Sequence, residues 1–362
     1  MSKERLQHIL ELAKWAPSGD NTQPWRFEIV DDSRIRVHGH DTRDHVLYDF
    51  QGHASHIAHG ALLETMRIAA SGLGLSCNWV SHSDAECRYA VYDVAFAEDP
   101  AIKASPLLEW VKLRSVQRRP MRTTPLTKSQ RGAIEAAAGD ALKLRYFDDA
   151  AKRLAVARLL WRSAKIRLVC KEAYPVHRDI IEWRTTFSKD RIPERAVGVD
   201  PMTARLMEWV MGSWERVSFF NKFLGGTILP RVQLDLLPGL LCGAHIAISP
   251  TKNPVTLEDW VHLGIRWQRV WLTISQCGLH MQPEMTPVIF RWYARSGSSF
   301  SSMPQLDGMA MEVAKGLEKL TGASPEDPIA FLFRVGTSNA PSSRSVRKDL
   351  PELLNGGPSG TG

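Results

Sequence analysis

The sequence predicts an α+β fold, in which helices surround antiparallel or mixed sheets, because helical and strand patterns succeed one another along its 362 residues. Residues 6–13 carry apolar side chains at helical spacing, and this helix should end before Pro17. Residues 25–29 then alternate as a strand does, and residues 35–37 indicate the returning arm of a hairpin. The chain therefore begins with a helix followed by two paired strands.

Later segments extend the same pattern. Thr127 and Gln130 have capping-box spacing at the start of a helix that should stop at Gly139. A long apolar helix is expected over residues 260–272. Gly278 should follow its C-terminal end, in the C′ position where a left-handed backbone is favoured. The remaining expected elements are a helix over residues 57–73 and strands around residues 92–96 and 329–336.

Length and charge limit the class of protein. At 362 residues and 44% hydrophobic content, the chain can bury a full core and is too large for one compact module. The net charge is +7, from 46 Lys and Arg against 39 Asp and Glu. The basic residues are dispersed and no zinc finger or RNP box is visible, so we expect phosphate-bearing small ligands and no nucleic acid.

Neither the cysteines nor the hydropathy suggests secretion or a membrane. The chain begins with a charged amphipathic segment and not a signal peptide, and its longest apolar run, residues 236–248, is short and interrupted. We expect a cytoplasmic protein with no membrane partner. No Cys-x-x-Cys pair occurs among the five cysteines, which are Cys77, Cys87, Cys170, Cys242 and Cys277.

Three histidines raise the question of a metal site. His53 and His56 share a helical face, but His59 is turned away from His53 and no fourth ligand lies near in sequence. The chain also lacks a P-loop, a Gly-x-Ser-x-Gly elbow and a Gly-x-Gly-x-x-Gly turn. We expect no metal ion.

The most specific motif lies between the first helix and the first strand. Residues 16–27 read Ala-Pro-Ser, a short gap, then Asn-x-Gln-Pro-Trp-x-Phe. Turn residues are common in any helix-to-strand loop. Their order, however, resembles the flavin-ring loop of the nitroreductase superfamily of FMN-dependent enzymes. The resemblance implies that Pro17 and Ser18 touch the flavin, that Asn21 hydrogen-bonds to it, and that Gln23 fixes the loop.

A dense group of arginines follows at residues 113–122. Such a group is either an anion site or a solvated basic face. It resembles the Arg-x-Ser-x-Arg segment that grips the FMN phosphate in nitroreductases, which implies phosphate roles for Arg114, Ser115 and Arg118. The chain departs from the pattern at Val116, where the family has a hydroxyl residue.

The end of the chain supplies a third element. After the strand expected over residues 329–336 comes a basic tail, residues 341–347. Taken alone, it could be a surface strand with a basic extension. It resembles the family's closing strand and phosphate-binding tail, which implies that Arg344 and Arg347 also bind the phosphate.

The motifs occur in an order that one nitroreductase would not have, and they indicate two incomplete copies. Ordinary nitroreductases are homodimers whose FMN sites lie between subunits. In a fused pair, the first copy has kept the ring loop and the second copy has kept the phosphate-binding segments. Such a chain should bind one FMN as a pseudo-dimeric monomer. The arrangement resembles the tandem single-chain subgroup that includes mycobacterial dormancy-associated proteins. The expected parts are a first repeat over residues 1–105, a second over 106–350 with an insertion at about 184–238, and a flexible tail over 351–362. Gly264 and Ser275 are small residues at which the central helices are expected to approach, and the matching helix of the first repeat carries Gly60, Ala61 and Ala69.

One further segment has a family counterpart. Residues 282–285 resemble the loop whose backbone N–H faces flavin N5, which implies that Pro283, Glu284 and Met285 lie at the flavin. A backbone N–H there would stabilise the negative charge that develops near N5 when the flavin is reduced. The glycine that often ends this loop in the family is absent here.

The resemblance implies an FMN-dependent oxidoreductase. NADH or NADPH would reduce FMN, and a small electron-poor, planar or aromatic substrate would then take the hydride, with no side chain acting as a catalytic acid or base. The alternative is a flavin-sequestering protein in which the insertion acts as a closed lid. A weaker possibility is a scaffold that has lost flavin.

Overall fold

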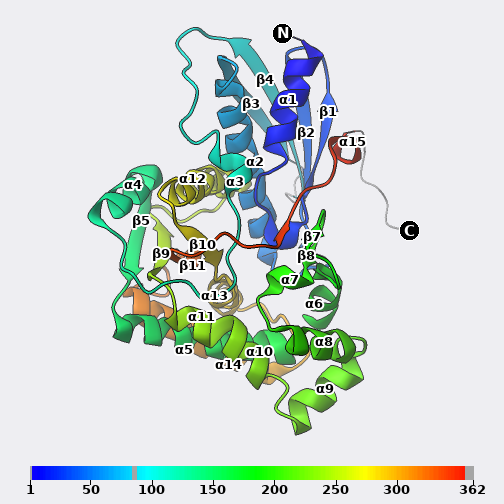
Figure 1. Ribbon diagram of the computed structural model, residues 1–362, viewed down its shortest axis with the longest axis vertical. Coiled ribbons are helices and arrows are strands. Elements are labelled where there is room, and N and C mark those ends of the chain that lie inside the picture. The colour runs from blue at the N-terminus through cyan, green and yellow to red at the C-terminus, as the bar shows by residue number, and fades with distance from the viewer. Residues whose placement is uncertain (1, 84–87, 355–362) are drawn as a thin grey trace.

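The computed structural model describes residues 2–83 and 88–354. Two four-stranded antiparallel sheets lie on either side of two long helices that cross at the centre, and a helical segment covers the end remote from the first sheet (Figure 1). The α+β expectation is confirmed, although both four-stranded sheets are antiparallel and neither is mixed.

The first half runs helix, hairpin, helix, hairpin. Its sheet has the order β1-β2-β4-β3. The apolar residues of α1 and one face of α2 are buried against this sheet, because both helices repeat apolar side chains at helical spacing. The elements are α1 (Lys3–Ala13), β1 (Trp25–Ile29), β2 (Arg34–His40), α2 (His53–Ser71), β3 (Leu75–Ser83) and β4 (Tyr89–Glu98).

The second half repeats this succession. Its sheet order, read as β5-β9-β11-β10, corresponds strand for strand to the first sheet. Thr127 and Gln130 form the expected capping box, and Gly139 (φ 64°) and Gly278 (φ 71°) have left-handed φ values where the helices end. The elements are α4 (Lys128–Ala138), β5 (Leu142–Phe147), β9 (Ala244–Pro250), α12 (Leu257–Gln276), β10 (His280–Pro283) and β11 (Phe331–Gly336).

Helices α2 and α12 touch backbone to backbone. A Cβ atom on Gly60 would lie 1.9 Å from the Val261 carbonyl oxygen, and one on Gly264 would lie 2.1 Å from that of Ile57. Only glycine permits this separation at both positions. The crossing joins the two halves into one body.

The halves differ at the link that follows their first helix. In the first half, residues 14–24 form a long loop between α1 and β1, whereas only residues 139–141 join α4 to β5. The first loop has room for the ring-loop motif and the second does not. The two halves therefore share a topology but not a ligand loop.

The segment between β5 and β9, residues 148–243, has no counterpart in the first half and is called the insertion from here on; it contains the expected range 184–238 and begins earlier. It forms the green group of helices in Figure 1 and one short parallel strand pair, β6 with β8, while its β7 pairs in parallel with β12 (Arg344–Ser345), which lies near the end of the described chain. Its elements are α5 (Ala150–Val169), α6 (Tyr174–Ile180), β6 (Ile181–Glu182), β7 (Phe187–Ser188), β8 (Ile192–Pro193), α7 (Glu194–Val197), α8 (Pro201–Val210), α9 (Trp214–Phe223), α10 (Ile228–Arg231), η3 (Val232–Leu236) and α11 (Leu237–Leu240).

The end of the described chain returns to the first sheet. The remaining elements are η1 (Gly19–Asn21), η2 (Phe50–Gly52), α3 (Trp110–Leu113), α13 (Thr286–Ser296), α14 (Pro304–Thr321), β12 (Arg344–Ser345) and α15 (Leu350–Leu353). Leu353 is fully buried and Leu354 bridges to Phe27, so the expected tail cannot begin before Asn355. Residues 355–362 lie outside the described part. None of the described helices is long and apolar enough to cross a membrane.

Candidate cofactor and substrate site

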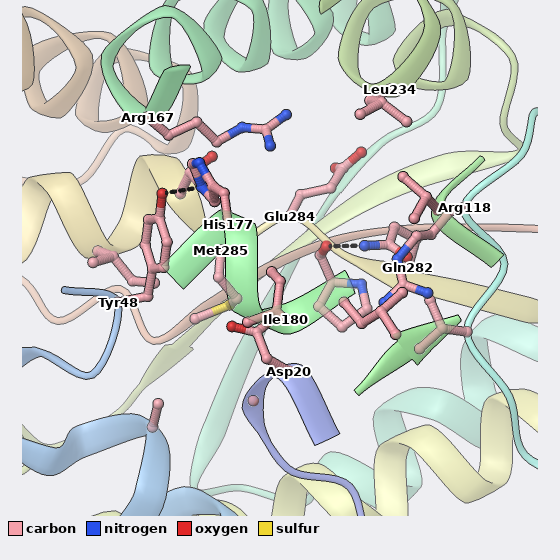
Figure 2. A pocket seen from close by; sticks show the side chains of 18 of the residues that line it. Asp20, Tyr48, Arg118, Arg167, His177, Ile180, Leu234, Gln282, Glu284 and Met285 are labelled. Atoms are coloured by element: carbon pink, nitrogen blue, oxygen red, sulfur yellow. Dashed lines mark hydrogen bonds between the residues drawn. The ribbon is translucent and has the colours of Figure 1, made fainter. Parts of the chain in front are cut away.

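A cavity of about 470 Å³ lies where four parts of the chain meet. They are the loop between α1 and β1 (residues 14–24, the ring loop), α2, the insertion and the turn after β10. This volume lies within the range of small-molecule sites. Figure 2 shows the side chains that line it, from both halves of the chain and from the insertion. Most of its surface is apolar, and its few charged groups are Asp20, Arg118, Arg167, Asp235, Glu284 and Arg334.

The ring loop follows the end of α1 and has an unusual backbone. Asp20, Asn21 and Gln23 all have positive φ, at 48°, 64° and 50°. Left-handed backbone is costly for residues other than glycine and persists where surrounding contacts enforce it. Here the Gln23 N–H donates to Ser18 Oγ at 3.0 Å, which closes the loop. Pro17 and Ser18 both line the cavity.

Asn21 is not among the residues that line the cavity. Its Nδ2 donates to the carbonyl oxygens of Lys189, Arg191 and Val346 at 3.1–3.4 Å, which ties the ring loop to the insertion and to the segment after β12. Its Oδ1 is buried and has no hydrogen-bond partner in the described part of the chain. One acceptor therefore remains on Asn21, while its amide nitrogen is already used.

Three of the predicted phosphate-binding arginines gather immediately behind the ring loop. Arg114 Nη2 donates to the Trp15 carbonyl oxygen at 3.0 Å, and Arg347 Nη2 donates to that of Ala16 at 3.1 Å. Arg344 lies over the Trp15 ring, with its guanidinium carbon 4.9 Å from the ring centroid. Segments separated by more than two hundred residues in the sequence thus meet next to Pro17.

This arginine cluster (Arg114, Arg344 and Arg347) carries positive charge without a matching carboxylate. Within residues 2–83 and 88–354, none of the three forms an ion pair. Burial and the charges of the two neighbouring arginines hold the pKa of Arg114 well below its usual range. The Nε atoms of Arg114 and Arg344 are buried without a hydrogen-bond partner in that part of the chain. The cluster would be stabilised by an anion.

The other two residues of the predicted phosphate segment lie differently. Arg118 lines the cavity, and its Nη1 donates to the Ala196 carbonyl oxygen at 3.3 Å. Ser115 is not among the lining residues, whereas its neighbour Val116 is. None of the three arginines of the cluster is among the lining residues, so the structure separates Arg118 from the arginine cluster.

The turn after β10 lies at the cavity, but its backbone differs from the expected arrangement. Pro283, Glu284 and Met285 all line the cavity. The Glu284 N–H, however, donates to the Leu332 carbonyl oxygen at 2.8 Å and is not free to face a flavin. Sheet pairing uses this donor. Met285 is the N-cap of α13, so its own N–H has no partner inside the helix.

The Glu284 side chain belongs to a buried ionic triad that the sequence does not indicate. His245 Nδ1 and Arg334 Nη1 donate to its two oxygens at 2.7 and 2.9 Å. His245 Nε2 also lies 2.7 Å from the Gly239 carbonyl oxygen, so both ring nitrogens donate and the ring is an imidazolium. Burial opposes this charge, but the Glu284 carboxylate raises the pKa of His245 to about 10.

Two of the three candidate metal histidines have other contacts in the structure. His53 stacks on Trp260 with ring centroids 3.7 Å apart, and His59 Nε2 bonds to the Pro24 carbonyl oxygen at 2.8 Å. Burial lowers the pKa of His53 and of His59 to about 3. Among the described residues, no group of three or more His, Cys, Asp and Glu could hold a metal ion.

Comparisons with known proteins agree with the motif at the start of the chain. Residues 1–51 match the model of the Nitroreductase family. A search of curated proteins found no match. The match to the family model contains the whole ring loop, residues 14–24.

The solved structures that resemble the chain include two nitroreductases and one nitroreductase-like protein. The FMN and NADPH-dependent nitroreductase NfnB from Sphigopyxis sp. strain HMH is 14% identical, with a TM-score of 0.38, over 70% of this chain and 99% of that one. The FMN-dependent NfnB from Mycobacterium smegmatis, in complex with NADPH, is 13% identical, with a TM-score of 0.36, over 69% and 96%. A nitroreductase-like protein from Bacillus cereus is 10% identical, with a TM-score of 0.35, over 70% and 97%.

Proposed function

We propose that the protein is an FMN-dependent oxidoreductase of the nitroreductase type, which transfers hydride from NADH or NADPH to a small, planar, electron-poor substrate. The observation that carries the proposal is the meeting of two motifs. The ring loop of the first half and the arginine cluster of the second half adjoin at Trp15 and Ala16, directly before Pro17. A flavin ring and its phosphate need neighbouring sites of these two kinds.

The residues at this place suit FMN. Pro17 and Ser18 would lie along the flavin ring, and the arginine cluster would bind the phosphate through charge-assisted hydrogen bonds, for which the unpartnered Nε atoms are available. When bound, FMN supplies the hydride chemistry. The protein would position the reactants, and the insertion would exclude water from the cavity.

The same reasoning favours a single site. Only the first half has a loop that can hold the ring motif, because residues 139–141 are too few to form one in the second half. We therefore propose a cytoplasmic tandem-repeat monomer, similar to the single-chain mycobacterial subgroup, that works on a small molecule without a nucleic-acid or membrane partner.

The proposal predicts one FMN per polypeptide. Purified protein loaded with FMN and then denatured should release about one equivalent of flavin, and anaerobic NADH or NADPH should bleach the bound flavin. Two equivalents would contradict the single site. A protein that stays colourless and takes up no FMN would contradict the function as a whole.

The alternative function, sequestration of flavin, is favoured by one observation. Side chains of the insertion line the cavity, among them His177, Trp214 and Leu234, so the insertion covers the place where a hydride donor would enter. Stopped-flow reduction by NADH and NADPH distinguishes the two functions. Rapid bleaching would exclude sequestration as the main role, whereas bleaching by dithionite alone would favour it.

The phosphate assignment is tested by Arg114→Ala. Loss of a charged hydrogen bond, worth about 1.5–3 kcal/mol, should weaken FMN binding roughly 10- to 100-fold. Riboflavin, which lacks the phosphate, should be affected far less. Arg119→Ala, in the same segment but exposed, is the matched control and should bind FMN like the wild type. Equal losses for riboflavin and FMN would show that Arg114 does not hold the phosphate.

A further inference from the structure

Tyr48 and His177 form a hydrogen-bonded pair at the cavity. Tyr48 follows β2 in the first half and His177 lies on α6 in the insertion. The Tyr48 hydroxyl oxygen is 2.7 Å from His177 Nε2, and the two rings stack with centroids 5.7 Å apart. Both side chains line the cavity, and Figure 2 shows the pair close to Met285. The insertion thus brings a polar pair to a cavity that is mostly apolar.

Both members of the pair are uncharged at neutral pH. Burial, together with the nearby Arg167 charge, lowers the pKa of His177 to about 3. Burial also raises the pKa of Tyr48 above its usual value. A neutral imidazole has one N–H, and a phenol both donates and accepts. When His177 Nε2–H donates to the Tyr48 oxygen, the Tyr48 O–H can donate to a ligand.

The surroundings of the pair favour an uncharged ligand. Arg167 is held by Asp235, with Nη2 2.8 Å from Oδ2, so its charge is balanced within the protein. Asp20 and Arg118 line the same cavity and carry opposite charges that act on each other: burial raises the pKa of Asp20, and the Arg118 charge opposes that shift, so the two groups offset one another. Apolar and aromatic lining residues complete the walls, among them Ile180, Met285, Ile289 and Trp292. A flat molecule with one hydrogen-bond-accepting oxygen matches this combination.

We propose that Tyr48 and His177 form a substrate-recognition subsite, in which the Tyr48 hydroxyl donates to the carbonyl or nitro oxygen of a planar, uncharged ligand while it accepts from His177. The ligand's role as electron acceptor rests on the proposed function. The binding of the ligand does not rest on it, because the subsite consists of side chains of this chain and needs no bound FMN. It gives the insertion a role in selecting the substrate.

The test compares three probes of similar shape. Menadione is a neutral quinone, 2-methylnaphthalene lacks its oxygens, and 1,4-naphthoquinone-2-sulfonate adds a negative charge. Binding is measured by quenching of tryptophan fluorescence, since Trp214, Trp267, Trp271 and Trp292 line the cavity. We expect menadione to bind more tightly than either other probe.

Variants then assign the preference to the pair. Tyr48→Phe should weaken menadione roughly 3- to 10-fold, the range for one lost hydrogen bond, and leave 2-methylnaphthalene and FMN binding unchanged. His177→Leu should also weaken the binding of menadione, by a smaller factor, and should leave the binding of 2-methylnaphthalene unchanged. Tyr146→Phe is the matched control, because Tyr146 is a tyrosine of β5 that does not line the cavity.

Each outcome bears on one proposal. Unchanged menadione binding in Tyr48→Phe, or an equal loss for 2-methylnaphthalene, would overturn the subsite. The titrations are made on both FMN-loaded and flavin-free protein. If the protein takes up no FMN but the flavin-free protein still shows the Tyr48-dependent preference, the proposed function fails and the subsite stands.

Discussion

Replacing Gly60 by alanine should destabilise the whole protein. The new Cβ would lie 1.9 Å from the Val261 carbonyl oxygen on α12, and a backbone oxygen cannot move aside as a flexible side chain can. The helices must separate, and the buried contacts along both are disturbed. Forced overpacking of this kind typically costs up to about 3 kcal/mol, and we expect Gly60→Ala to reach that value in urea unfolding.

Gly132→Ala provides the matched control for this experiment. Gly132 also lies within a helix, α4, but a Cβ atom there would meet nothing within 4 Å. Its replacement should stabilise the protein by about 0.4–1 kcal/mol, because the unfolded chain loses freedom. If Gly60→Ala unfolded at the same urea concentration as the wild type, the two helices would not be in backbone contact.

Much of the fold was predictable because its signals are local. The apolar spacing of residues 6–13, the alternation in residues 25–29 and the Thr127 capping box each depend on neighbours within a few positions. The structure confirms all three. The shared topology of the two halves was predicted only through the family resemblance, since their sequences offer no obvious repeat.

The site was harder to predict because its parts meet through tertiary structure. Nothing near Tyr48 in the sequence indicates His177, which lies 129 positions away. His245 lies on β9 and Glu284 directly follows β10, so their pairing depends on how the strands of the sheet are placed. Motifs did place Pro17, Ser18 and Met285 at the cavity. The motif implies a backbone N–H at flavin N5 without saying which residue supplies it. The structure uses the Glu284 N–H for the Leu332 carbonyl oxygen, a pairing that no motif indicates.

Asn21 illustrates a different limit. The motif predicts that its side chain contacts flavin, whereas in the structure its amide nitrogen holds the insertion and the segment after β12. This anchoring depends on carbonyl oxygens far away in the sequence, at Lys189, Arg191 and Val346, which the motif itself does not indicate. A hydrogen bond from a ligand to its free Oδ1 remains a prediction.

The buried ionic triad of Glu284, His245 and Arg334 should be sensitive to loss of its one carboxylate. Glu284→Gln keeps the shape but leaves the buried Arg334, and His245 if it stays protonated, without a counter-charge. Breaking a buried ion pair in this way costs about 3–5 kcal/mol. We expect a loss of that order in urea unfolding at pH 6. Glu312→Gln, at an exposed glutamate paired with Lys315, should unfold like the wild type.

The pH dependence identifies the source of this loss. Because the pKa of His245 is raised from 6.5 to about 10 in the folded protein, its contribution to the free energy of unfolding is complete below pH 6.5 and disappears as the pH rises through about 10. The pKa of Glu284 is lowered from 4.5, because the charges of His245 and Arg334 outweigh the opposing effect of burial. The contribution of Glu284 to the free energy of unfolding is therefore present above pH 4.5 and lost at lower pH. Wild-type stability should therefore fall between pH 6.5 and 10, and Glu284→Gln should show a flatter profile there because the carboxylate that raises the pKa of His245 most is then absent. Parallel profiles for the two proteins would mean that His245 is not held as an imidazolium by Glu284.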